Sequence, residues 1–185
     1  MIGSPEGRWP PIYDAEGLAA VIRELADADD FEARFWSLRV GDDGPCQGDV
    51  IHLPSSVPML DEDGAAVATD DCAQWLLIGN TCDIAREMQD VAFTQLVPLV
   101  SVGTAAPSVV RKYRQYSHSR RFYVPPWPSG DEDHRFADFL RPVTVDKRAL
   151  TSRARRLARM EYPAWVLLHS CLVRFLARDD GRFDE

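Results

Sequence analysis

The sequence lacks the short motifs by which common ligands are held. It has no glycine-rich loop of the phosphate-binding or dinucleotide-binding kind. Its four cysteines and four histidines include no Cys-x-x-Cys or His-x-x-x-His pair, the spacings that favour zinc. A group of carboxylates offers oxygen ligands for a divalent cation, but such a run is more often a solvated loop; it comprises Asp61, Glu62, Asp63, Asp70 and Asp71. We therefore expect neither a metal nor a cofactor.

Long apolar runs and disulfide spacings are missing as well. No stretch approaches the ~18 continuous apolar residues of a membrane-spanning helix, and the first residues lack the layout of a signal peptide. Cysteine is represented only by the irregularly spaced Cys46, Cys72, Cys82 and Cys171. These absences predict a cytoplasmic protein with free thiols and no contact with a membrane.

Positive charge is scarce in the first part of the chain. Residues 1–100 contain 5 Lys and Arg against 19 Asp and Glu, whereas residues 101–185 contain 16 against 10. Many of the cations fall in two groups, which are Arg111, Lys112, Arg114, Arg120 and Arg121, and Arg153, Arg155, Arg156 and Arg159. Such groups can lie along phosphates, or they can neutralise the acidic half within the fold or in a homodimer. We favour neutralisation.

The pattern of apolar residues predicts an α+β protein. Helices are expected at 14–30, 107–116, 146–159 and 164–178, with a helical turn at 84–89. Strands are expected at 31–40, 48–53, 74–79, 93–102, 121–124 and 136–145, and a long polar loop or loose hairpin, a candidate lid, at 55–71. Pro98 places the strand that contains it at an edge or a bulge. The economical fold is a single domain over residues 1–185, a small antiparallel SH3-like barrel or curled sheet at about 33–145, with an N-terminal helix and two C-terminal helices at about 146–178.

Three segments carry a resemblance to a known family. The order of Gly48–Ile51, a long loop, Trp75–Ile78 and Leu96–Ser101 resembles the strand order of MazF/PemK-type toxins, which are small SH3-like barrels of toxin-antitoxin systems. The resemblance implies a metal-independent endoribonuclease with an antitoxin-like protein partner. It also implies an Arg near the second strand and a Ser or Thr after the third. Ser101 or Thr104 matches the latter, but no Lys or Arg lies between Arg39 and Arg86.

The chain also resembles a group of uncharacterised bacterial barrel proteins. The segments that carry this resemblance are Asn80–Ile84, Arg121–Pro126 and Leu172–Arg178. The resemblance implies a bacterial protein and no particular activity.

Cys82 and Asp83 follow the apolar run 74–79 and form a candidate catalytic pair. A cysteine nucleophile needs a base that stabilises its thiolate, and an adjacent carboxylate does the opposite. His118 or His134 would have to serve as that base in a Cys-dependent hydrolase. The alternative, which we favour, is a buried structural cysteine beside an Asp83 that caps the following turn.

The segment 111–123 interleaves cations with Tyr113, Tyr116, Phe122 and Tyr123, as grooves for single-stranded nucleic acid often do. In a second interpretation the aromatic rings face the core while the arginines pair with the acidic half. The leading functional hypothesis is a barrel that binds RNA or a partner protein. The alternative is an endoribonuclease toxin that uses Ser101 or Thr104 with an Arg from 111–121, and a Cys82-dependent hydrolase is third.

Overall fold

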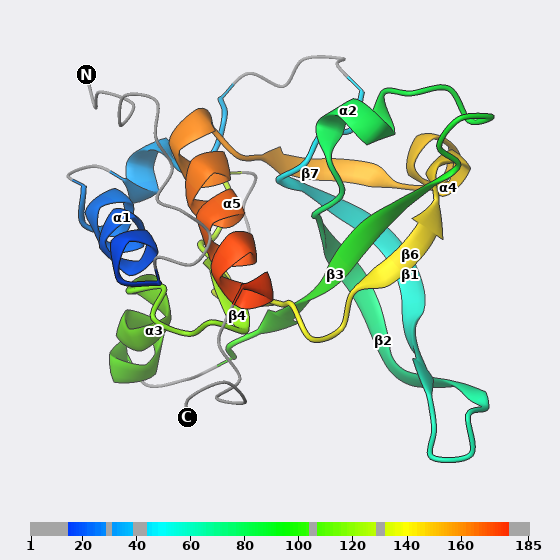
Figure 1. The fold of residues 1–185 in the computed structure, drawn as a ribbon, viewed down its shortest axis with the longest axis horizontal. Helices are drawn as coiled ribbons and strands as arrows, with labels where there is room; N and C mark the ends of the chain where they lie inside the picture. Colours follow the sequence, from blue (N-terminus) through cyan, green and yellow to red (C-terminus); the bar gives the residue numbers. More distant parts are fainter. Residues whose placement is uncertain (1–14, 29–30, 39–43, 104–106, 129–131, 178–185) are drawn as a thin grey trace, which may run out of the picture.

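The computed structural model describes residues 15–28, 31–38, 44–103, 107–128 and 132–177. Its centre is a curled sheet of seven strands (Figure 1) in which every pairing is antiparallel. The strand order is β4-β5-β3-β2-β1-β7, with β6 also paired to β3. The strands are β1 (Asp49–Leu60), β2 (Ala66–Leu77), β3 (Phe93–Ser101), β4 (Arg121–Val124), β5 (Arg135–Asp138), β6 (Val143–Asp146) and β7 (Arg155–Arg159). The predicted α+β class with a curled antiparallel sheet is confirmed.

The helices gather mainly on one side of the sheet (Figure 1). They are α1 (Ala15–Asp27), α2 (Thr81–Ile84), α3 (Pro107–Arg114), α4 (Lys147–Ser152) and α5 (Tyr162–Leu176), with a 3-10 turn η1 at Glu32–Arg34. Helices α1 and α5 pack against each other. The predicted N-terminal helix and the two C-terminal helices are therefore present as α1, α4 and α5.

The central strands are buried on both faces. Val50, Leu76 and Val97 belong to the larger core beneath the helices, while Ile51 and Trp75 belong to a second core closed by Leu150 of α4. Successive residues of a strand point to opposite faces. Strands covered on both sides therefore carry continuous apolar runs rather than an alternating pattern.

Strand β3 is central, so the prediction of an edge position for Pro98 is wrong. β3 pairs with β2 on one side, and on the other it pairs with β6 through Leu96 and with β5 from Leu99 onward. Pro98 lies where the partner changes from β6 to β5. A residue without an N–H is tolerated there because the ladder is interrupted at that point.

The segment 55–71, expected as a polar loop or loose hairpin, is a hairpin that continues the pairing of β1 and β2 out to Leu60 and Ala66, with register shifts on either side of Ser55 and Ser56. Strand β7 pairs with β1 only as far as His52, and β3 pairs with β2 only from Trp75. The outer hairpin is thus a two-stranded ribbon that projects from the body of the molecule (Figure 1). The predicted lid is an extended arm.

Three other predicted elements need correction. Residues 31–38 form η1 and a single bridge, because Phe31 and Phe35 are buried one turn apart instead of alternating with polar residues; residues 39 and 40 lie outside the described chain. The strand expected at 136–145 is two strands, β5 and β6, separated by a turn. The helix expected at 146–159 ends at Ser152, and 155–159 forms β7 along β1, so the sheet extends beyond position 145.

Candidate functional site

Five cations lie on α3 and the start of β4. Arg111, Lys112, Arg114, Arg120 and Arg121 are all exposed, and we call them the basic surface. Residues 107–128 contain no Asp or Glu. Arg114 forms an ion pair with Glu32 at 2.9 Å. Within the described ranges of the chain, Arg111, Lys112 and Arg120 have no ion pair. The predicted neutralisation by the acidic half is therefore partial at this surface.

Most aromatic rings of the segment belong to the core, as the second interpretation predicted. Tyr116, Phe122 and Tyr123 are at most 2% exposed. Tyr116 has a positive φ of 49° just past the end of α3, an uncommon conformation for a bulky residue. Arg174 of α5 holds this turn, because its guanidinium donates to the carbonyls of Tyr116 at 2.5 Å and His118 at 3.0 Å. The turn that leads to Arg120 is thereby fixed to the body.

A cation and three rings cluster beside this turn. The Arg121 guanidinium lies 4.5 Å from the ring centroid of Phe136 and donates to the Tyr113 hydroxyl at 2.7 Å. Tyr113 stacks on Phe136 with centroids 5.3 Å apart, and the exposed His118 ring lies 5.1 Å from Tyr113. Phe136 comes from β5 and its role could not be seen in the sequence, because the contact depends on the pairing of β4 with β5.

A polar chain runs inward from Arg114. Its guanidinium Nε also lies 3.4 Å from the Tyr123 hydroxyl, and this hydrogen bond raises the pKa of Arg114. The same hydroxyl lies 2.6 Å from Nδ1 of His134. Burial raises the pKa of Tyr123, so the phenol stays protonated near neutral pH. Arg114 is therefore a partly structural cation, unlike Arg111 or Arg120.

Ser101 lies at the end of β3 and is exposed. Its hydroxyl accepts from the backbone N–H of Gly103 at 2.9 Å and lies 3.5 Å from the Asp133 carboxylate. Asp133 in turn forms an ion pair with Arg135 at 3.2 Å. In the described part of the chain no Arg of the basic surface contacts Ser101, and Thr104 lies outside the described residues.

Cys82 is exposed, so the prediction of a buried structural cysteine is wrong. It is the second residue of α2, which begins at Thr81 and not at 84 as predicted. Asp83 lies inside this short helix and pairs with Arg86 at 3.6 Å, so it does not cap the following turn. Among the residues described, no hydrogen bond joins Cys82 to a histidine. The pair lacks the base that a cysteine nucleophile requires.

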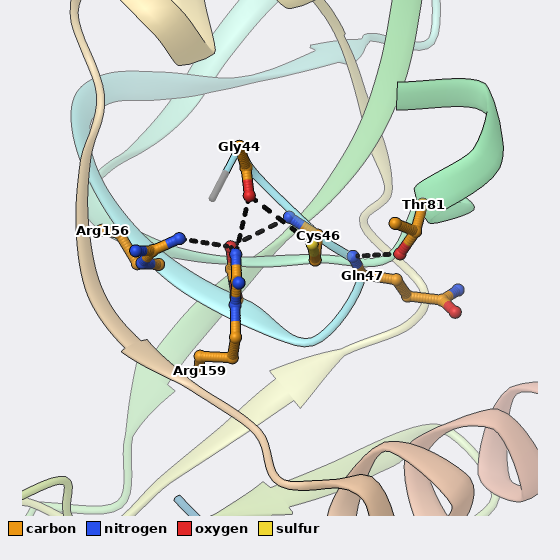
Figure 2. Close-up of polar contacts among 7 residues, drawn as sticks. Gly44, Cys46, Gln47, Thr81, Arg156 and Arg159 are labelled. Carbon is orange, nitrogen blue, oxygen red and sulfur yellow. Dashed lines mark hydrogen bonds and ion pairs between the residues drawn. The ribbon is translucent and has the colours of Figure 1, made fainter. Parts of the chain in front are cut away.

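A buried ion cluster at the start of β1 was missed by the sequence analysis. Asp49 is fully buried and accepts two hydrogen bonds from Arg159, from Nε at 2.7 Å and Nη2 at 2.9 Å. It also accepts from the Cys46 backbone N–H at 2.9 Å, and Arg156 lies 3.8 Å away. Figure 2 draws these contacts, together with the hydrogen bond of 2.7 Å from Arg159 to the Gly44 carbonyl. The bidentate geometry fixes the loop before β1 to β7.

Gln47 connects this loop to α2 and α5. Its backbone N–H donates to the Thr81 hydroxyl at 3.0 Å (Figure 2), and its side chain donates to the Ile78 carbonyl at 2.7 Å. The amide oxygen accepts from Trp165 Nε1 at 2.9 Å. Since Gln47 is 7% exposed and all these groups are paired, it holds the structure together rather than meeting a ligand.

Beside Gln47, an open pocket of about 560 Å³ lies between α5 and the ends of β2 and β3. Its walls are mainly apolar, and polar groups reach it from Asn80, Asp83 and His169. Burial lowers the pKa of His169, which favours the neutral imidazole. Among the described residues, the buried hydroxyl of Thr94 has no hydrogen-bond partner. It packs over Gly79, where a Cβ would approach it to 2.0 Å. Gly79 is thus required by packing.

The described residues give no sign of a metal centre or a membrane segment. No group of three or more His, Cys, Asp or Glu side chains within the described ranges is arranged to hold a metal ion. Among the described helices, none is long and apolar enough to cross a bilayer.

Comparisons with known proteins give a distant structural likeness. No protein-family model and no curated protein matches the chain. A chain in the crystal structure of MazE-MazF (Form-I) from Deinococcus radiodurans is similar with a TM-score of 0.40 and 12% identity, covering 75% of this chain and 100% of that one. The Form-II crystal structure gives a TM-score of 0.39 and 14% identity over the same shares. MazF gives its name to the family that the strand order of the sequence resembles, and similarity at this level assigns no activity to this chain.

Proposed function

We propose that the chain binds single-stranded RNA through the basic surface. The observation that carries the proposal is the set of exposed cations Arg111, Lys112 and Arg120, which lack an ion pair in the described part of the chain. They occur in a segment without a carboxylate, residues 107–128. Cations placed in this way attract phosphates because binding releases condensed counterions.

The neighbouring rings favour a single strand over a duplex. Tyr113 and Phe136 form a stacked pair, with the Arg121 guanidinium over Phe136 and the tilted His118 ring beside Tyr113. His118 and Arg121 are exposed, so an unpaired base can stack on either planar group. The bases of a duplex are already stacked and do not offer such faces.

Binding without cleavage fits the site better than an endoribonuclease. Ser101 is occupied by Gly103 and Asp133, and Asp133 by Arg135. An acidic neighbour disfavours the approach of a phosphate to this hydroxyl. A Cys-dependent hydrolase is less well supported, because no histidine of the described residues is hydrogen-bonded to Cys82. We further propose that residues 1–185 act as one domain in the cytosol, with RNA as the partner in place of an antitoxin-like protein.

The test is fluorescence anisotropy of a labelled 12-nucleotide RNA of mixed sequence, titrated with protein at several salt concentrations. The double variant Arg111→Ala/Arg120→Ala removes two phosphate contacts. It should weaken binding at low salt and reduce the slope of log affinity against log salt by about 1.4, at about 0.7 per contact.

The matched control is Arg153→Ala/Arg155→Ala, which removes the same charge from two exposed residues at the end of α4 and the start of β7. Helix α4 lies across the molecule from α3 (Figure 1). This control should keep most of the affinity and the wild-type slope. Equal losses in both variants, or no binding by the wild type at 50 mM salt, would refute the proposal. Gel analysis of the same RNA after incubation should show intact RNA, and cleavage abolished by Ser101→Ala would favour the endoribonuclease instead.

A further inference from the structure

The arm, which we define as residues 54–73, has the opposite charge pattern to the basic surface. It contains five carboxylates and no Lys or Arg, whereas residues 107–128 contain five cations and no carboxylate. The carboxylates of the arm are Asp61, Glu62, Asp63, Asp70 and Asp71. The two charge patterns are therefore complementary.

Within one molecule the arm and the basic surface do not meet. Helix α3 and the tip of the hairpin lie at opposite ends of the longest axis of the molecule (Figure 1). The tip carboxylates Glu62 and Asp63 have no ion pair among the residues that the structure describes. Any pairing of the tip with the basic surface must therefore take place between two molecules.

The arm is anchored at its base, where Val57 is 2% exposed in the second core and Asp70 pairs with Arg141, but its tip is uncovered. Beyond the pairing with β3, residues 66–74 extend the ribbon by roughly 30 Å at about 3.4 Å per residue. Residues 62–71 are exposed throughout, and Met59, Leu60 and Val67 at the tip are 50%, 68% and 36% exposed. A two-stranded ribbon in water is marginally stable unless an apolar face is covered. The tip therefore offers both charge and apolar area to a partner.

We propose that the arm of one molecule docks on the basic surface of a second copy, and that two such contacts form a two-fold symmetric dimer. In this dimer Glu62 and Asp63 face Arg111 and Lys112 of the other copy. The exposed apolar residues of the tip meet Val109, which is 39% exposed on α3. Because the contact occurs twice, each arm has to supply only about half of the roughly 1,600 Å² that a stable interface buries.

Docking of the arm on the basic surface of a second copy is favoured over a dimer in which two arms pair with each other. Two arms side by side bring ten carboxylates together. Arg141 pairs with the Asp70 of each arm at 2.8 Å, and the remaining negative charge is repulsive. The edge of β1 in the arm also carries Pro54 and Pro58, and the pairing with β2 is shifted on either side of Ser55 and Ser56. Proline and bulges of this kind block strand addition. The inference does not depend on RNA binding, although the dimer would cover the surface that we assign to RNA.

The test uses two charge-reversed variants and sedimentation velocity on RNA-free protein at 50 mM salt. Glu62→Lys/Asp63→Lys reverses the tip of the arm, and Arg111→Glu/Lys112→Glu reverses the basic surface; all four side chains are exposed. The wild type should be a dimer that dissociates as salt is raised. Each variant alone should be a monomer, because both of its symmetric contacts are repulsive.

An equimolar mixture of the two variants should restore the dimer, since each contact then joins a reversed arm to a reversed surface or a native arm to a native one. Circular dichroism of each variant confirms that it is folded. A monomeric wild type at 50 mM salt and 100 μM protein, or variants that remain dimeric alone, would overturn the proposal. So would a mixture that stays monomeric. RNA affinity is measured separately, so a failure of the dimer and a failure of RNA binding give different results.

Discussion

Replacing Asp49 by Ala should be among the most destabilising single changes in this chain. The carboxylate is fully buried and receives four polar contacts, two hydrogen bonds from Arg159, one from the Cys46 backbone and the ion pair with Arg156. Removing one partner of a buried pair typically costs about 3–5 kcal/mol, because the other charge is left without compensation. The Arg159 side chain is 19% exposed and keeps the Gly44 carbonyl, so we expect the lower end, about 3 kcal/mol.

The assays are urea unfolding and thermal unfolding, both followed by tryptophan fluorescence. For a chain of this length about 3 kcal/mol corresponds to a fall in melting temperature of roughly 6–12 °C. Asp146→Ala is the matched control, because Asp146 also binds an arginine, Arg148, but lies on the surface at the start of α4. It should destabilise less, because its ion pair is screened by water and the main loss is the N-cap that Asp146 provides to α4.

The charge explanation has a second check. Arg159→Met leaves Asp49 buried with its main partner gone, and the double variant Asp49→Ala/Arg159→Met removes both charges. If the two residues act as a pair, the double variant should lose less stability than the two single variants added together. Additive losses, or a loss below about 1 kcal/mol for Asp49→Ala, would refute the reasoning.

Two further predictions concern cysteine and histidine. In a short pulse of iodoacetamide at pH 8, mass spectrometry should find Cys82 labelled first and Cys171 last, because Cys82 is exposed whereas burial raises the pKa of Cys171 to about 12; equal labelling of both would contradict the structure. The stabilising effect of neutral His169 should be present above about pH 6.5, where an unfolded histidine is also neutral, and be lost as the pH falls through its lowered folded pKa. The free energy of unfolding of the wild type should therefore fall more between pH 7 and pH 5 than that of His169→Gln, and parallel pH profiles in urea unfolding would argue against a buried neutral imidazole.

The sequence was sufficient to predict the central strands, because their signal is local. Val50, Leu76 and Val97 lie in apolar runs too short for a helix and bounded by turn residues. That both faces of these strands are covered became visible only in the structure.

The strand β7 could not be predicted, because its signal is not local. Residues 155–159 are Arg, Leu and Ala, which all favour helices. They form a strand because β1 offers an unpaired edge and Asp49 binds Arg159 across 110 positions of sequence. A contact of this range outweighs local preference, and it also explains why the buried ion cluster was missed.

The sequence identified the cations of the candidate site, but it did not show which of them are already engaged within the fold. Nothing in the sequence distinguishes the five cations of the basic surface from one another. In the structure, Arg114 is engaged with Glu32 and Tyr123, whereas Arg111 and Arg120 have no ion pair with a described residue. The exposure of Cys82 depends on the point at which β2 ends, two residues before Gly79. Neither fact can be deduced from residue types alone.

The separation of charge along the molecule links the RNA proposal to the dimer proposal. Charges attract weakly beyond a Debye length, which is about 8 Å at physiological salt, so an arm and a basic surface at opposite ends of one molecule do not neutralise each other. Each stays available to an outside partner of the opposite sign. RNA and the arm of a second copy are both polyanions, and in the two proposals both bind Arg111 and Lys112. Because one surface cannot hold two polyanions at once, RNA and the second copy must compete for it, and dimer formation would then limit RNA binding as protein concentration rises.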